Sequence, residues 1–232
     1  VSGVVHLSRA ACLGYIKNGF ALIRPPGHHA GLLKSTVITE ETSPDEVGFS
    51  GFCLYNHAAI AARAVLHEFP VVNKVLIFDF DVHHGNGTQN IFYCDNNVLF
   101  CSIHRFAEGF FPQTGDYTEV GGLMTDANNE AFDGRGYTVN CPVPNCAYDH
   151  HYICAFAYFF LPIIASYRPD FIIISAGFDC LSGDPLGMLK VSPMCLWHIV
   201  RALCSIQQKQ RVVAILEGGY HPKTVAEGIC HV

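Results

Sequence analysis

The chain has 232 residues, of which half are hydrophobic and 15% are charged, so it can form one α/β domain with a large core. Its net charge of −6 argues against general binding to nucleic acid or to a membrane surface, and no apolar run is long enough to span a bilayer. The 11 cysteines form no CxxC pair, which favours reduced thiols over a zinc ribbon or a redox motif. The 13 histidines make a metal or proton-transfer site worth seeking.

Short β-rich segments alternate with longer helical segments, a pattern typical of a mostly parallel α/β sheet. In chain order we predict a strand at Phe20–Arg24, a loop at Gly31–Ser50, a helix at Asn56–Glu68, strands at Val75–Asp81 and Val98–Ile103, a loop at Thr118–Gly136, a strand at Tyr137–Val143, a helix at Asp149–Ser166 kinked by Pro162, a strand at Phe171–Ser175, a helix at Pro193–Gln207 and a strand at Arg211–Leu216. Without a linker or a repeat, residues 1–232 are expected to form a single domain.

Four of the predicted strands are followed directly by polar residues and glycines. These segments are RPPGHH (Arg24–His29), DFDVHHGNG (Asp79–Gly87), SAGFD (Ser175–Asp179) and EGGYH (Glu217–His221). The carboxyl ends of parallel strands face the crevice in which ligands bind. We therefore expect the four segments to meet in one site.

The second and third of these segments contain a set of possible metal ligands. Asp79, Asp81 and His83 alternate, so they would share one face if the strand continues. Carboxylates buried together are costly without a cation. Asp81, His83 and Asp179 would supply three ligands and leave one position open, as in catalytic metal sites. The alternative is that Asp81 and His83 only cap a strand end exposed to solvent. The second carboxylate and the other polar segments make this alternative less favourable.

His28 and His29 are adjacent, so they cannot both easily bind one ion, and proton transfer or hydrogen bonding suits them better. The residues alone leave this role and that of an exposed turn equally open. Tyr220 is either an ordinary loop aromatic or a substrate contact, with the glycines before it allowing close approach of the backbone.

Six segments together resemble the zinc-dependent histone deacetylase family, in the family's order and over nearly the whole chain. They are RPPGHHA (Arg24–Ala30), GFCLYN (Gly51–Asn56), DFDVHHGNGTQ (Asp79–Gln89), SIHRF with GFFPQTGD (Ser102–Asp116), SAGFDCLSGDPLG (Ser175–Gly187) and LEGGY (Leu216–Tyr220). The resemblance implies the arginase/deacetylase fold, a three-layer α/β/α arrangement around a mostly parallel eight-stranded sheet. Family domains normally extend further in both directions, so we expect the chain to be truncated at both ends.

Three positions bear on the branch of the family. Asn86 stands where class I members carry Asp, and Glu217 stands where they carry Gly, so the resemblance is closer to class II. Tyr220 stands where the weakly active class IIa enzymes of vertebrates carry His. The tyrosine therefore implies an active enzyme. Leu186 stands where acetylpolyamine deacetylases carry Glu, which favours a peptide acetyl-lysine over a cationic polyamine.

The resemblance also assigns roles to individual residues. It implies that Asp81, His83 and Asp179 bind zinc, and that His28 and His29 are the catalytic histidines, paired with Asp79 and Asn86. Substrate contacts would come from Gly51, Phe52, Phe111, Leu186 and Gly219. A potassium ion would be held by Asp79, Asp81, His83, Ser102 and Ile103, and a second one near Phe92, Asp95, Val98 and Tyr137.

The expected reaction is zinc-dependent hydrolysis of the acetyl-lysine amide in histones or other proteins. We expect His29 to act as the general base, His28 as an electrostatic partner and Tyr220 as the oxyanion donor. The alternatives are a deacetylase-like module that binds acyl-lysine without turnover, an acetylpolyamine deacetylase and an arginase-like binuclear manganese hydrolase. Corepressor-type protein partners and residence in the nucleus or cytoplasm are further expectations, with no direct nucleic-acid or membrane partner.

Overall fold

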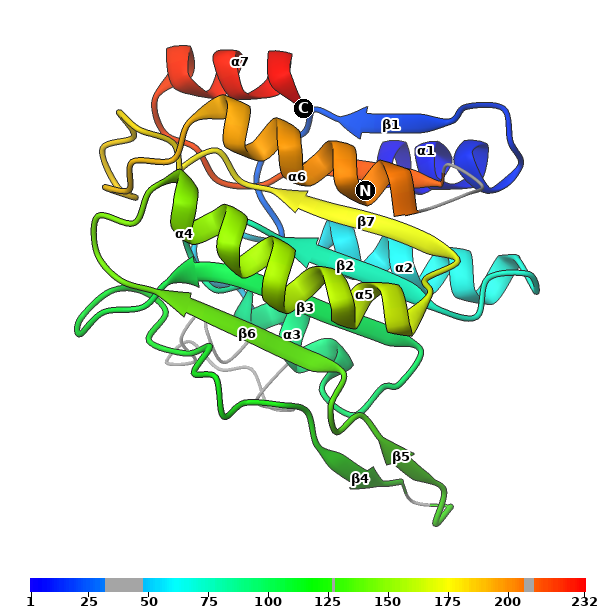
Figure 1. The fold of residues 1–232 in the computed structure, drawn as a ribbon. Helices are drawn as coiled ribbons and strands as arrows, with labels where there is room; N and C mark the ends of the chain where they lie inside the picture. Colours follow the sequence, from blue (N-terminus) through cyan, green and yellow to red (C-terminus); the bar gives the residue numbers. More distant parts are fainter. Residues whose placement is uncertain (32–47, 127, 207–210) are drawn as a thin grey trace, which may run out of the picture.

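The computed structural model describes residues 1–31, 48–126, 128–206 and 211–232, so most of the predicted loop Gly31–Ser50 lies outside the described residues. Six strands form one parallel sheet in the order β1-β8-β7-β2-β3-β6 (Figure 1). Their bounds are β1 Asn18–Ala21, β2 Val75–Asp79, β3 Val98–Arg105, β6 Thr138–Val143, β7 Phe171–Ala176 and β8 Val212–Leu216. The predicted α/β class is confirmed. The described residues contribute six strands to the central sheet, whereas the family resemblance implies eight.

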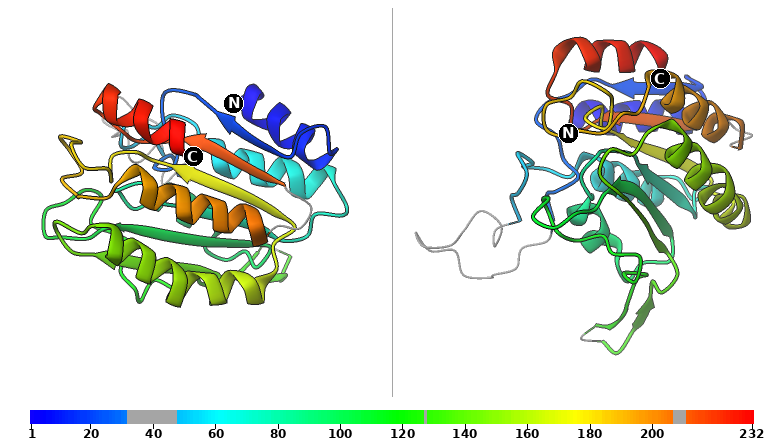
Figure 2. Two further views of the ribbon diagram at one scale, coloured as in Figure 1. Left: turned by 45° about the horizontal axis from the view of Figure 1, so that its top comes forward. Right: turned by 60° about the vertical axis from the view of Figure 1, so that its left-hand side comes forward.

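Helices cover both faces of this sheet, which gives the predicted three layers (Figures 1 and 2). One face carries α1 (Ser2–Cys12), α2 (His57–Glu68) and α3 (Asn86–Phe92). The other carries α4 (Asp149–Cys154), the π-helical segment η1 (Ala155–Phe160), α5 (Leu161–Tyr167), α6 (Pro193–Ile206) and α7 (Pro222–His231). Among the described residues, no helix is both long and apolar enough to cross a membrane.

The apolar strands are explained by burial on both faces. In β2, Val75 and Ile77 belong to the core under α1 and α2, whereas Leu76 and Phe78 belong to the core under α4 to α6. Successive side chains of a strand point to opposite faces, so a strand between two helical layers needs a continuous apolar run.

Four features of the fold differ from the sequence prediction. The predicted helix Asp149–Ser166 is a continuous helical run whose middle part, Ala155–Phe160, is π-helical, and Pro162 lies just after that part. The predicted loop Thr118–Gly136 contains an antiparallel pair, β4 (Leu123–Thr125) and β5 (Ala131–Asp133). The strand predicted at Phe20–Arg24 is instead Asn18–Ala21, and the helices α1, α3 and α7 were not predicted.

The carboxyl ends of the strands lie along one edge of the sheet, at the left in Figure 1. The polar segments that follow β1, β2, β7 and β8 all begin there. Because the strands are parallel, this arrangement is the one that the sequence pattern predicts for a ligand site.

Candidate active site

The three predicted metal ligands lie together at this edge of the sheet. The ligand atoms of Asp81, His83 and Asp179 are all within 4.8 Å of one another, and the three side chains are buried. Nδ1 of His83 is 3.1 Å from Oδ1 of Asp81 and 3.1 Å from Oδ2 of Asp179. Among the described residues, this is the group of three acidic, histidine or cysteine side chains that could hold a metal ion.

The backbone reason for this arrangement differs from the predicted one. β2 ends at Asp79, so strand alternation does not place Asp81 and His83. Instead, Oδ1 of Asp79 accepts a hydrogen bond from Asp81 N–H at 3.0 Å, and Oδ1 of Asp81 accepts one from His83 N–H at 2.9 Å. Two successive side-chain-to-backbone turns therefore set the positions of the ligands, and Asp79 faces His28.

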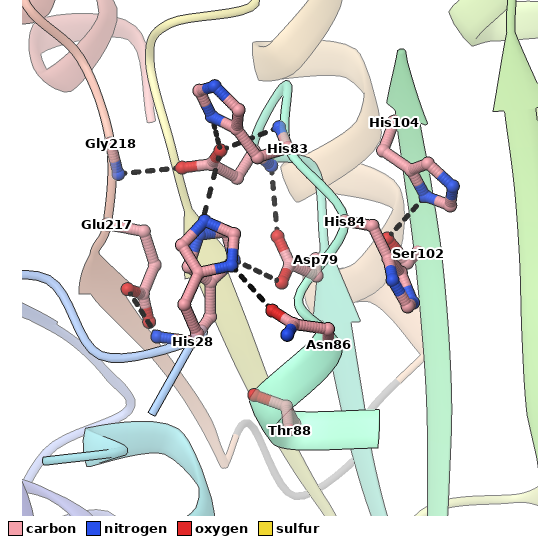
Figure 3. Close-up of polar contacts among 12 residues, drawn as sticks. His28, Asp79, His83, His84, Asn86, Thr88, Ser102, His104, Glu217 and Gly218 are labelled. Carbon is pink, nitrogen blue, oxygen red and sulfur yellow. Dashed lines mark hydrogen bonds and ion pairs between the residues drawn. The ribbon is translucent and has the colours of Figure 1, made fainter. Parts of the chain in front are cut away.

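Backbone N–H groups also hold the carboxylates of the ligands. Val82 N–H donates to Oδ1 of Asp179 at 2.9 Å. Gly218 N–H donates to Oδ2 of Asp81 at 2.7 Å, and Figure 3 draws this bond from Gly218. A Cβ at Gly218 would overlap Oδ2 of both Asp81 and Asp179. The glycine after Glu217 is thus required because the chain passes directly against the ligand oxygens.

The chemistry of this group fits a divalent cation. Burial and the neighbouring charge of Asp81 raise the pKa of Asp179 to about 7. Burial lowers the pKa of His83, but hydrogen bonds to Asp179 and Asp81 outweigh it and raise that pKa to about 10. The pocket between the carboxylates thus favours a positive charge, and two carboxylates with one imidazole are a ligand set that Zn²⁺ accepts.

Gly218→Ala is expected to weaken zinc binding by about 10- to 100-fold, the usual effect of disturbing the groups that orient metal ligands. The added methyl group would displace the Asp81 and Asp179 carboxylates. Competition with a chromogenic chelator measures this affinity. Gly3→Ala in α1, where a Cβ would meet nothing within 4 Å, is the control. Equal zinc affinity in Gly218→Ala and the wild type would contradict this account.

The two adjacent histidines have different partners, as the family resemblance implies. Nδ1 of His28 is 2.9 Å from Oδ2 of Asp79, whereas Nδ1 of His29 is 2.7 Å from Oδ1 of Asn86 (Figure 3). Nε2 of His28 also lies 3.8 Å from Oδ1 of Asp81. One ring therefore faces carboxylates and the other faces a neutral amide.

These partners shift the two imidazoles in opposite directions. Burial lowers the pKa of His28, but the charges of Asp81 and Asp79 outweigh it and raise that pKa well above 6.5. Burial, followed by the charge of His28, lowers the pKa of His29 well below 6.5. The carboxylates thus favour the protonated form of His28, whereas burial and the charge of His28 favour the neutral form of His29, which has a free lone pair.

A pocket of about 260 Å³ opens above the metal ligands. It is lined by His29, Gly51, Phe52, His83, Phe111, Leu186 and Tyr220. A Cβ at Gly51 would overlap the His29 ring, so the backbone lies against that imidazole. Gly219, a predicted substrate contact, is not among the lining residues, and its carbonyl oxygen accepts a hydrogen bond from Nη2 of Arg24 at 2.7 Å.

The residues predicted to bind potassium include two of the metal ligands, Asp81 and His83, and three residues of the neighbouring strands. Asp79 and Ser102 are paired in the register of β2 and β3, and Ile103 follows in β3. Oγ of Ser102 is 2.8 Å from Nδ1 of His104 (Figure 3). The residues of the second predicted potassium site, which are Phe92, Asp95, Val98 and Tyr137, lie near the opposite ends of β3 and β6.

Sequence reasoning missed two carboxylates that hold the site together. Oε2 of Glu217 accepts hydrogen bonds from the backbone of the histidine turn. Oδ2 of Asp184 accepts one from Tyr220 N–H at 2.7 Å, and its Oδ1 accepts from Leu186 N–H at 2.8 Å. Both residues lie within the six family-like segments, but bonds to distant backbone groups leave no trace in a sequence pattern.

Comparison with known proteins shows the family to which the chain belongs. The family model of the histone deacetylase domain matches residues 1–232. The chain is 43% identical to histone deacetylase 15 of Arabidopsis thaliana over 92% of its length, 36% identical to histone deacetylase HDA1 of Saccharomyces cerevisiae over 99%, and 39% identical to human histone deacetylase 9 over 95%. It spans 34%, 30% and 20% of the length of these relatives.

Solved structures give the same result. The crystal structure of the HDA15 HD domain matches with a TM-score of 0.84 at 40% identity, covering 99% of this chain and 58% of that one. The structure of the histone deacetylase Clr3 matches with a TM-score of 0.81 at 34% identity, covering 99% of this chain and 34% of that one. The chain therefore belongs to the histone deacetylase family, among its class II, HDA1-type members.

Proposed function

We propose that this chain catalyses zinc-dependent hydrolysis of the acetyl-lysine amide in histones or other proteins, giving lysine and acetate. The observation that carries the proposal is the pocket in which His29, His83 and Tyr220 converge between the aromatic side chains of Phe52 and Phe111. An apolar channel suits the aliphatic stem of lysine, and the polar groups at its base suit the amide. Family membership supports a deacetylase rather than another hydrolase.

Asp81, His83 and Asp179 would hold the zinc ion. When bound, zinc would polarise the acetyl carbonyl and lower the pKa of water, so that the water is more easily deprotonated. The neutral imidazole of His29 would accept the proton of the attacking water and then deliver it to the leaving amine. The cationic His28 would stabilise the developing negative charge.

Tyr220 would donate a hydrogen bond to the oxyanion of the tetrahedral intermediate. Burial raises the pKa of its phenol, so the group keeps its proton at physiological pH. A preorganised donor aimed at the developing charge stabilises the transition state more than the ground state. The Asp184 carboxylate holds the backbone of this tyrosine, which restricts where the hydroxyl can lie.

His29→Ala is expected to lower kcat more than His28→Ala does, because only His29 is neutral and able to take a proton. Loss of a general base typically costs about 10²- to 10⁴-fold in rate. Steady-state kinetics on an acetyl-lysine peptide, with the zinc content measured for each variant, makes the comparison. If His28→Ala were the more damaging substitution, the two roles would be exchanged.

The function is tested by measuring acetate release from an acetyl-lysine peptide by metal-free and zinc-reconstituted protein. Zinc-dependent acetate release would support the proposal. Binding without turnover would instead indicate an acyl-lysine binding module. N-acetylspermidine serves as the competing substrate, and a preference for it would contradict the peptide assignment, which rests on the apolar Leu186 at the pocket. Dependence on two manganese ions per chain would favour an arginase-like hydrolase.

Potassium binding by Asp79, Asp81, His83, Ser102 and Ile103 is a further part of the proposal. The pairing of Asp79 with Ser102 across adjacent strands supports it. Activity in potassium chloride and in tetramethylammonium chloride at equal ionic strength tests it.

We also propose acetylated proteins as partners, corepressor-type protein partners, and a nuclear or cytoplasmic site of action.

A further inference from the structure

The carboxylate of Glu217 is buried at the end of β8 and hydrogen-bonds the turn that carries the two histidines. Its Oε2 accepts from Gly27 N–H at 2.7 Å. It also accepts from His28 N–H at 3.1 Å (Figure 3). The residue is 0% exposed, and its own N–H donates to Ala176 O in β7 at 3.0 Å. One carboxylate thus joins the central sheet to a turn 190 residues earlier in the chain.

This carboxylate accepts the first backbone N–H groups that the histidine turn offers after its two prolines. Pro25 and Pro26 carry no N–H, so the next two donors along the chain are those of Gly27 and His28, and both donate to Glu217. The carbonyl oxygen of His28 accepts from the N–H of Thr88 at 3.1 Å, and its ring is held by Asp79. Within the turn, Ala30 N–H also donates to Gly27 O at 3.0 Å. Glu217 is the acceptor for the two N–H groups that follow the prolines and thus restrains the backbone of His28 directly.

Folding alone does not account for an acidic residue here. Oε1 of Glu217 is buried without a hydrogen-bond partner among the described residues, which is unfavourable for a carboxylate. Burial raises the pKa of this carboxyl to about 7, although the neighbouring His28 opposes the shift. Groups that are costly for folding tend to be found where they support a functional site.

Building on the proposed deacetylase function, we propose that Glu217 is a positioning residue that fixes the His28 backbone and thereby directs the ring of His29 into the pocket. Glu217 does not itself line the pocket, so it acts through the histidine turn. Arg24 makes a second link between the same two segments through its hydrogen bond to Gly219 O. The two links keep the proton acceptor His29 and the oxyanion donor Tyr220 in a fixed relative position.

The test compares Glu217→Ala, Glu217→Gln and the wild type, with Asp170→Ala as a matched control. Asp170 also accepts hydrogen bonds from two consecutive N–H groups, those of Asn73 and Lys74, but on an exposed turn. Glu217→Ala is expected to lower kcat by about 10²-fold, the effect of a small displacement of a catalytic group, while KM and zinc content change less than about threefold. Glu217→Gln keeps an acceptor oxygen and is expected to recover most of the loss, and Asp170→Ala is expected to leave kcat unchanged.

Amide hydrogen exchange, measured by NMR, reports on the same bonds without substrate. The Gly27 and His28 amides are expected to exchange at least about tenfold faster in Glu217→Ala and at near wild-type rates in Glu217→Gln. Unchanged kcat in Glu217→Ala, or a loss of kcat with unchanged exchange, would overturn the proposal. If Glu217→Ala does not fold, Glu217→Asp carries the test, and wild-type kcat there would overturn it. An inactive wild type would refute the deacetylase function, while the exchange rates would still decide whether Glu217 holds the turn.

Discussion

Tyr220→Phe is expected to lower kcat on an acetyl-lysine peptide by about 10²- to 10³-fold, the usual effect of removing one oxyanion donor. The substitution removes only the hydroxyl, so the aromatic contact with Phe52, at a ring-centroid distance of 6.1 Å, is kept. The backbone bond from Tyr220 N–H to Asp184 is also unaffected. Because the hydroxyl acts on the transition state, KM is expected to change much less than kcat.

Two measurements make this result specific. Zinc content is expected to be unchanged in Tyr220→Phe, since Asp81, His83 and Asp179 make up the proposed ligand set. Tyr117→Phe, which alters an exposed tyrosine, is the control for loss of a phenolic hydroxyl and is expected to leave kcat unchanged. Retained wild-type turnover in Tyr220→Phe would refute the oxyanion role and leave the metal assignment intact.

Asp179→Asn is expected to abolish zinc binding and deacetylase activity while leaving the metal-free protein at least as stable as the wild type. Burial and the charge of Asp81 both disfavour the ionised Asp179 carboxylate in the folded state. A neutral amide removes that repulsion, and its oxygen can still accept from Val82 N–H. The free energy of unfolding of the metal-free protein is therefore expected to remain within about 1 kcal/mol of the wild type or to rise.

With zinc present, the wild type is expected to be more stable than Asp179→Asn. A ligand that binds only the folded state adds about 4 kcal/mol to the free energy of unfolding at one thousand times its Kd. The wild type is expected to gain this increment and Asp179→Asn is not. Denaturant unfolding with and without zinc measures both quantities. A large loss of stability in the metal-free variant would show that the carboxylate serves folding rather than metal binding.

That the residues of the four polar segments lie together could be predicted from the sequence, because they follow strand ends. The rule that ligands bind beyond the carboxyl ends of parallel strands brings together residues as distant as His29 and Tyr220. The order and chemistry of the four polar segments were sufficient for this prediction. The strands of the centre of the sheet were predictable for the same reason, since their apolar runs are continuous.

The details that sequence reasoning missed depend on local backbone geometry and on tertiary contacts. The helix α3 begins at Asn86 and includes Gly87, residues that favour turns, and its packing against the sheet outweighs that preference. The strand β2 is two residues shorter than its apolar pattern predicts because the Asp79 side chain caps the turn that follows. The partners of Glu217 and Asp184 are backbone N–H groups, and the identity of a residue does not reveal where its N–H points.

The order of strands in the sheet also affects how the chain folds. β8 is the last strand among the described residues, yet it occupies an interior position between β1 and β7. Within the part of the chain that the structure describes, β1 pairs with β8 alone, so it gains this neighbour only when residues 212–216 are available. Contacts of such long sequence separation form slowly and leave apolar edges exposed in the meantime. We therefore expect β1 to remain without this partner until residues 212–216 have been synthesised, and refolding of the chain to be slow and limited by aggregation at high concentration.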